Sequence, residues 1–265
     1  MHRQMLPESI PGSMTSSRAE EKLDVRRRVW KTLRTVARPD SRFHFDFTSF
    51  ITDFEGSDRA TARLVELSSY KNSTVVFITP DNCLEELRLR ALRDGKTVLM
   101  TTYGIRRGFW ELDPVKIEES QYANAAMLDG MERLGTPLSL ADILAKRWHI
   151  PFMVTGTGAI NTRGVRFGKG HGFFDLEWAI LYTLGVVDQT TVAAAIVHDC
   201  QVLEEELHPE EFDTLCEVVV TPTRVLHVPD VQKPTCGVLW PLLQPNMLER
   251  IPPLQELKAM SLQKL

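Results

Sequence analysis

The spacing of hydrophobic positions near the start of the chain predicts two helices. Apolar side chains recur at helical intervals over residues 18–37, and Pro39 ends this helix because proline cannot continue the backbone hydrogen bonding. The apolar positions are Leu23, Val29, Leu33 and Val36. A loop rich in phenylalanine follows, and residues 56–58 have the composition of a helix start. We therefore expect two helices before the first strand.

Short apolar runs farther along the chain predict buried strands. Residues 74–78 and 97–100 are two such runs, with a helix expected between them at 84–94. A strand, a helix and a strand within about 25 residues indicate a βαβ unit with parallel strands. Further strands are expected at 152–154, 191–197 and 218–221, and further helices at 139–147 (capped by Ser139), 174–184 and, weakly, near the C-terminus.

This alternation predicts the α/β fold class, as a three-layer sandwich with a mostly parallel central sheet. No break in composition marks a boundary inside it. We expect a disordered N-terminal lead-in at 1–18, one α/β domain at 19–230, and a C-terminal extension at 231–265 that packs on the domain. The lead-in is polar and lacks the apolar core of a signal peptide, which indicates a cytoplasmic protein.

Composition narrows the class of protein. The chain is 43% hydrophobic and 25% charged, which is ordinary for a globular protein. Its net charge of −4 gives no general reason to expect a nucleic-acid or membrane partner, and no apolar run has the roughly 20 residues that span a bilayer. The four cysteines show no Cys-x-x-Cys spacing, so we expect free thiols in a reducing compartment and no zinc site.

The clearest chemical feature is a glycine loop at residues 168–172, Gly-Lys-Gly-His-Gly. Its three glycines allow backbone N–H groups to approach an anion closely, and the helix that follows adds unpaired N–H donors. Arg166 and Lys169 add positive charge, and Asp175 in the first helical turn is placed to hold Mg²⁺ on a phosphate. A tight strand-to-helix turn would also use glycines, and the spacing matches neither a Rossmann nor a Walker A loop. We expect a phosphate site here.

Residues 168–175 resemble the Gly-Arg/Lys-Gly-x-Gly-Tyr-Tyr-Asp signature of the 5-formyltetrahydrofolate cyclo-ligase family, also called methenyltetrahydrofolate synthetases. The next residues, 176–179, are closer to a divergent branch, the methenyltetrahydrofolate synthetase domain-containing proteins. Three more segments resemble that branch: 22–26 its Lys-x-x-x-Arg helix, 53–57 its Asn-Phe-x-Gly-Ala/Ser turn, and 221–225 its Thr-Pro-Thr-Arg-Val strand. The resemblance covers about residues 21–228.

The resemblance implies a fold related to sugar-phosphate isomerases and CoA-transferases, and an enzyme that uses ATP and Mg²⁺ as cofactors. Members of the family phosphorylate the formyl oxygen of 5-formyltetrahydrofolate; N10 then attacks, phosphate leaves, and 5,10-methenyltetrahydrofolate forms. The implied partner is a small-molecule folate, with no nucleic acid and no membrane.

The resemblance also implies the site residues. Catalytic roles fall on Lys169 and Arg166, and metal binding on Asp175 and Asp213. The implied ATP contacts are Lys22, Arg26, Gly168, Lys169, Gly170, His171, Gly172, Phe173 and Phe174. Other interpretations remain open at several positions. Lys22 and Arg26 also fit a solvated basic face, Asp175 a favourable charge at a helix N-terminus, and Asp213 a loop carboxylate. His171 fits either a phosphate contact or a side chain without a role.

A few more polar residues invite a functional reading. Gln201 matches a glutamine of the family, whereas His198 and Asp199 are better explained as a polar pair at a strand end.

The chain departs from the family pattern at several positions, including residues 155–159, where Thr-Gly-Thr-Gly-Ala replaces the usual Pro-Gly-x-Ala-Phe run. Phe173 and Phe174 stand where the signature has tyrosines, Leu176 replaces an arginine, and Phe212 replaces a frequent histidine. No residue near Pro80 and Asp81 clearly matches the family's substrate-binding glutamate. The alternative is therefore a paralogue without cyclo-ligase activity, either an ATP-dependent enzyme on another formyl or amide substrate or a noncatalytic folate- or nucleotide-binding regulator. An isomerase or CoA-transferase reaction lacks a catalytic glutamate motif.

Overall fold

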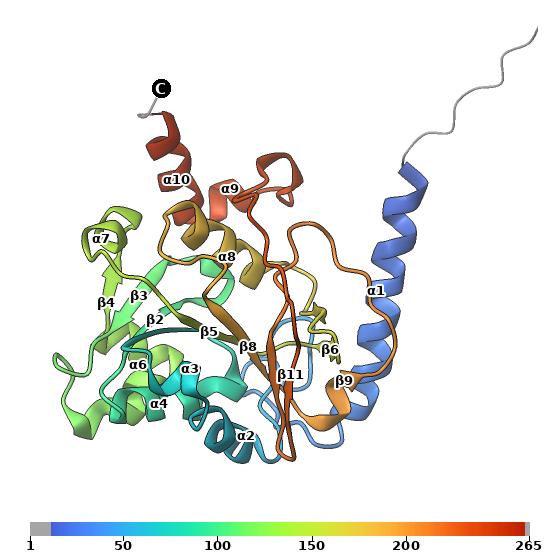
Figure 1. The fold of residues 1–265 in the computed structure, drawn as a ribbon, viewed down its shortest axis with the longest axis horizontal. Helices are drawn as coiled ribbons and strands as arrows, with labels where there is room; N and C mark the ends of the chain where they lie inside the picture. The colour runs from blue at the N-terminus through green and yellow to red at the C-terminus, as the bar shows by residue number, and fades with distance from the viewer. Residues whose placement is uncertain (1–11, 263–265) are drawn as a thin grey trace, which may run out of the picture.

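A computed structural model describes residues 12–262 of the chain, with side chains from Arg18 onward. Helix α1 spans Gly12–Leu33, so it starts six residues before the predicted helix and includes residues 12–18 of the predicted lead-in. The rest of that lead-in, residues 1–11, lies outside the described residues. Helix α1 stands at the side of the domain (Figure 1). It packs through Val25 and Val29 on a small sheet and through Leu33 on the phenylalanine-rich loop.

The domain is built on an eight-stranded sheet with the order β11-β10-β8-β5-β1-β2-β3-β4. The five strands from β10 to β2 pair in parallel, and β11, β3 and β4 add antiparallel edges. The strands are β1 Val75–Ile78, β2 Thr97–Thr101, β3 Phe109–Leu112, β4 Thr136–Leu138, β5 Phe152–Thr155, β8 Val192–Ile196, β10 Val218–Val220 and β11 Val225–His227. A separate sheet joins β7 (Arg166–Phe167), β6 (Ala159–Asn161) and β9 (Val202–Leu203). The predicted mostly parallel sheet is confirmed.

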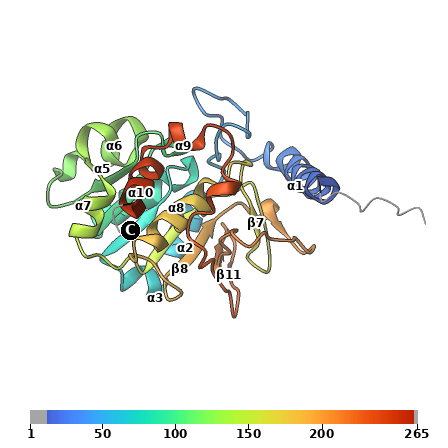
Figure 2. The same ribbon diagram turned by 90° about the horizontal axis from the view of Figure 1, so that it is seen from above.

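Helices cover both faces of the large sheet, which gives the predicted three layers (Figures 1 and 2). One face carries α2 (Ser57–Leu64), α3 (Ser68–Lys71), α4 (Glu85–Arg93), α5 (Tyr122–Ala126) and α6 (Leu128–Leu134). The other carries α7 (Leu140–Ala145), α8 (Phe173–Thr183), α9 (Met247–Arg250) and α10 (Pro252–Leu262). Short 3₁₀ turns lie at Asn82–Leu84, Tyr103–Ile105, Glu119–Gln121, Asp199–Gln201 and Trp240–Leu242.

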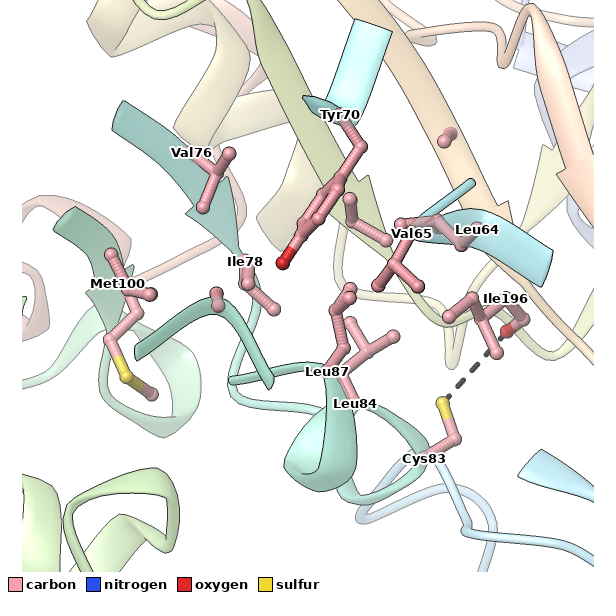
Figure 3. Packing of buried hydrophobic residues seen from close by; sticks show 14 of the residues in the cluster. Leu64, Val65, Tyr70, Val76, Ile78, Cys83, Leu84, Leu87, Met100 and Ile196 are labelled. Carbon is pink, nitrogen blue, oxygen red and sulfur yellow. Dashed lines mark hydrogen bonds between the residues drawn. The ribbon is translucent and has the colours of Figure 1, made fainter. Parts of the chain in front are cut away.

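The core forms because the parallel strands are apolar on both sides. All four residues of β1 are buried, as expected for a strand covered by helices on each face. Figure 3 shows Tyr70 of α3, Leu84 of the 3₁₀ turn before α4 and Leu87 of α4 in one cluster with Val76 and Ile78 of β1. All four cysteines are free, as predicted. Within residues 12–262, every helix is too short or too polar to span a bilayer.

Local sequence explains several element boundaries. Ser139 caps α7 as predicted: its Oγ accepts a hydrogen bond from the Asp142 N–H at 3.1 Å, and the Asp142 carboxylate accepts from the Ser139 N–H at 2.9 Å. The segment 221–225 differs from its prediction as a strand. Residues 221–224 form the turn between β10 and β11, where the Thr221 Oγ1 accepts from the N–H groups of Thr223 and Arg224. A threonine hydroxyl competes with ladder hydrogen bonds in this way.

The C-terminal residues 231–262 lie against the α8 face of the sheet. Ile251, Leu254 and Leu257 are buried in the core cluster there, next to α8 and α7. The Trp178 indole also donates to the Pro234 carbonyl at 2.9 Å.

Candidate functional site

A cavity of about 310 Å³ opens where the parallel strands end and α8 begins. Its floor comes from residues that follow β1, β2 and β5, because parallel strands present their carboxyl ends at one edge of a sheet. All twelve site residues expected from the sequence line this one cavity: Lys22, Arg26, Arg166, Gly168, Lys169, Gly170, His171, Gly172, Phe173, Phe174, Asp175 and Asp213. Helix α1 carries Lys22 and Arg26. Arg26 contacts the loop at Gly168, which is 142 residues later in the sequence.

The glycine loop adopts a conformation that favours glycine. Gly170 has φ 109° and Gly172, the N-cap of α8, has φ 66°, a left-handed region where a Cβ is costly. The Gly172 position supplies no side-chain cap, so the first amides of the 11-residue α8 keep their donors for a ligand. The Gly168 carbonyl accepts from Arg26 Nε at 2.6 Å, which fixes the loop to α1.

Two cations of the cavity have no carboxylate partner among the described residues, Arg26 and Lys169. The Lys169 ammonium donates to the Ser49 carbonyl at 3.2 Å and lies 5.0 Å from the Tyr103 ring centre and 5.8 Å from that of Phe173. Burial lowers the pKa of Lys169 and of Arg26, because a buried cation has lost hydration. Both cations would regain stabilisation from an anion bound in the cavity.

The other two cations pair with carboxylates at the same wall. Arg166 forms an ion pair with Asp175 and donates through Nε to the Thr214 carbonyl at 3.1 Å. Asp175 also accepts from the Thr214 N–H at 2.8 Å, and burial raises its pKa against the opposing effect of Arg166. Lys22 pairs with Asp213 at 3.2 Å.

Asp175 and Asp213 suit a magnesium ion that is shared with a ligand. Both aspartates line the cavity, and Asp175 accepts a hydrogen bond from the N–H of Thr214, the residue that follows Asp213. The described residues contain no group of three or more acidic, histidine or cysteine side chains that would hold a metal alone. Mg²⁺ is commonly held by one or two carboxylates together with phosphate oxygens and waters, so two aspartates fit it.

Sequence reasoning missed two carboxyl groups on the cavity floor. Glu177 is 2% exposed and lies one residue beyond Leu176 in α8, where it accepts a hydrogen bond from the Thr101 hydroxyl. Burial raises the pKa of Glu177 to about 8. Asp81 accepts from the Thr79 hydroxyl and, at 2.9 Å, from the Gly156 N–H. A charged residue inside the apolar run 176–181 was the available signal for Glu177.

The remaining polar candidates lie away from the cavity. Gln201 is buried and donates to the Thr157 carbonyl at 2.6 Å, so it supports the loop after β5. His198 Nδ1 accepts from the Cys200 N–H, while Asp199 accepts from the hydroxyls of Thr221 and Thr223. His198 and Asp199 therefore serve separate turns, as expected of a strand-end pair.

Comparison with known proteins decides the family. Residues 18–222 match the model of the 5-formyltetrahydrofolate cyclo-ligase family. The chain belongs to that family. This confirms the resemblance seen in the glycine loop.

Curated relatives of this cyclo-ligase family member are methenyltetrahydrofolate synthase domain-containing proteins. The Danio rerio protein is 30% identical over 253 residues, covering 92% of this chain and 63% of its own length. The Homo sapiens protein is 31% identical over 242 residues, covering 90% and 61%. The chain thus spans about three fifths of the length of these relatives. A solved structure of Aquifex aeolicus 5,10-methenyltetrahydrofolate synthetase is 16% identical with a TM-score of 0.48, covering 80% of this chain and 95% of that one.

Proposed function

We propose that the protein is an ATP- and Mg²⁺-dependent enzyme that converts 5-formyltetrahydrofolate to 5,10-methenyltetrahydrofolate. The observation that carries this proposal is the convergence of four cations and the glycine loop on one cavity, with two carboxylates beside them. Membership of the cyclo-ligase family supplies the reaction class. Folate is the second substrate in this proposal.

Each residue has a defined task in such a reaction. The loop amides and Lys169 would bind the terminal phosphate oxygens, and Arg26 would neutralise charge from the α1 side. Bound magnesium would draw charge from those oxygens, and Asp175 and Asp213 would hold it. The formyl oxygen takes the γ-phosphoryl group of ATP and ADP leaves; N10 then attacks the formyl carbon and loses its proton, and phosphate leaves. The chain contributes position and charge to these steps.

Lys169 and Lys31 provide a matched test. Lys169 lines the cavity, whereas Lys31 is an exposed residue of α1 outside it. We expect wild type and Lys31→Ala to form the methenyl product, seen as its absorbance band, when 5-formyltetrahydrofolate, ATP and Mg²⁺ are supplied. We expect Lys169→Ala to lose about 100-fold in kcat/KM, because it removes the positive charge that binds the transferred phosphoryl group. Folded wild-type protein that forms no product would refute the assigned activity.

A second function is favoured by the composition of the cavity lining. Four positions that depart from the family pattern line the cavity: Phe173, Phe174, Leu176 and Phe212. The departures thus bear on ligand contact and leave the phosphate loop unchanged. In this case the protein would bind or hydrolyse ATP on another formyl or amide compound, or bind a folate or nucleotide without turnover. ATP-dependent phosphate release without methenyl product would favour the first of these, and a nucleotide-induced rise in Tm with no turnover the second.

A further inference from the structure

A segment near the C-terminus borders the cavity, although it lies beyond the residues that the family model matches. The match ends at residue 222, and the bordering segment is 237–247, which we call the C-terminal wall. Its cavity-lining side chains are mostly apolar: Val238, Leu239, Leu242, Leu243, Gln244 and Met247. The cavity is therefore completed by residues that the family signature does not include.

The C-terminal wall is held at both ends. Before it, the fully buried Lys233 ammonium pairs with Glu217 at 2.5 Å, and Trp178 donates to the Pro234 carbonyl. After it, the buried side chains of α10 anchor the chain in the core. Gln244 Nε2 also donates to the Gly170 carbonyl at 3.3 Å, so the wall contacts the glycine loop. These anchors make the wall a fixed side of the cavity.

Two side chains of the wall face the cavity without supporting the core. Val238, Leu243 and Met247 pack against the core cluster of the α8 face, whereas Leu239 and Leu242, within the described structure, are outside that packing. Leu242 is 57% exposed. Apolar side chains that line a pocket in this way gain their burial from a bound ligand.

The side of the cavity next to Lys169 is aromatic. Tyr103 and Phe173 both line the cavity, and the Lys169 ammonium is within 5.0 Å and 5.8 Å of their ring centres. Lys169, the proposed phosphate contact, therefore lies directly beside apolar surface. A substrate that receives phosphate there places its apolar part within a few bonds of the reacting group.

We propose that the C-terminal wall selects the second substrate, and that this substrate carries an aromatic or aliphatic body attached close to the oxygen that accepts the phosphoryl group. The inference rests on the proposed nucleotide-dependent function. It assigns substrate selection to Leu239 and Leu242. Small polar acceptors such as formate or formamide leave both leucines in water and are poor substrates.

Substitutions in the wall separate recognition of the two substrates. Leu239→Ser combined with Leu242→Ser removes apolar contact, Leu239→Trp fills the cavity, and Leu262→Ser is the control because Leu262 is an exposed leucine of α10 outside the cavity. We expect both wall variants to raise KM for 5-formyltetrahydrofolate at least tenfold, with a smaller change in kcat. The Tm shift produced by ATP and Mg²⁺ should stay as in wild type. Leu262→Ser should match wild type in every readout.

A second probe tests the wall without relying on folate. 1-Anilinonaphthalene-8-sulfonate is an aromatic anion, and its fluorescence should report saturable binding that both wall variants weaken and Leu262→Ser does not. Wall variants that keep wild-type KM and wild-type probe binding would overturn the wall inference while leaving the proposed function standing. Wild type that forms no methenyl product, with probe binding that depends on the wall, would overturn the function and leave the wall.

Discussion

Glu177 holds a carboxyl group in the most apolar helix of the site. Ile180 and Leu181 follow it in α8 and are fully buried, and one hydroxyl, from Thr101, is its hydrogen-bond donor. A carboxylate loses hydration in such surroundings, which is why burial raises the pKa of Glu177 to about 8. Protonated at neutral pH, the group can donate as well as accept a hydrogen bond in the cavity.

This raised pKa predicts how stability depends on pH. Between the ordinary glutamate pKa and about 8, the folded chain binds more protons than the unfolded chain, so stability falls as pH rises and levels off above that range. From pH 6 to pH 8 the Glu177 contribution to the free energy of unfolding should fall by about 2 kcal/mol. Glu177→Gln should remove that part of the slope in urea unfolding series. An unchanged slope in the variant would assign the effect to another group.

At the scale of elements, short-range pattern decided what could be predicted. The strands of the parallel core were predicted because burial on both faces makes them continuous apolar runs, as in β1 and β5. The strands β6, β7 and β9 have two or three residues each and no periodicity to detect. Strands β3 and β4 were not predicted. Strand β3 pairs with β2 across a short connection, whereas β4 pairs with β3 only after α5 and α6 have intervened.

The site residues also divide into those that a local sequence motif reveals and those that only tertiary packing brings together. The glycine loop, Lys169 and Asp175 lie within eight residues, so a local motif contains them. Asp81, Tyr103 and the C-terminal wall join the cavity only through the packing of distant elements. Glu177 lay inside a predicted helix, but its direction toward the cavity depends on tertiary structure.

A capped helix provides the prediction at this scale. Ser139→Ala removes the hydrogen bond to the Asp142 N–H and should cost about 1 kcal/mol of the free energy of unfolding. Ser68, the exposed first residue of α3, makes no cap, so Ser68→Ala should change stability by less than about 0.5 kcal/mol. Urea denaturation of both variants at one pH measures the difference. Equal losses would show that the capping box of α7 contributes little.

The whole molecule is assembled around one cavity by parts that pack separately. Helix α1 contributes Lys22 and Arg26 but packs on the small sheet and the phenylalanine-rich loop, whereas the glycine loop leads into α8 of the main domain. Arg26 donates to the Gly168 carbonyl and Lys22 pairs with Asp213, so two side chains of α1 are fixed at the edge of the cavity. A phosphate-bearing ligand would add further contacts to both sides.

That arrangement has a consequence for motion. A ligand that contacts both α1 and the glycine loop would hold α1 against the domain. Amide hydrogen exchange in residues 22–33 should therefore slow when ATP and Mg²⁺ are added. Exchange in α4, on the far face of the sheet, should not change. Mass spectrometry of deuterium uptake with and without nucleotide measures this, with Arg26→Ala expected to weaken the protection. Equal protection of both helices would point to global tightening. Protection confined to residues 22–33 would mean that the nucleotide completes the tertiary structure of the N-terminal helix.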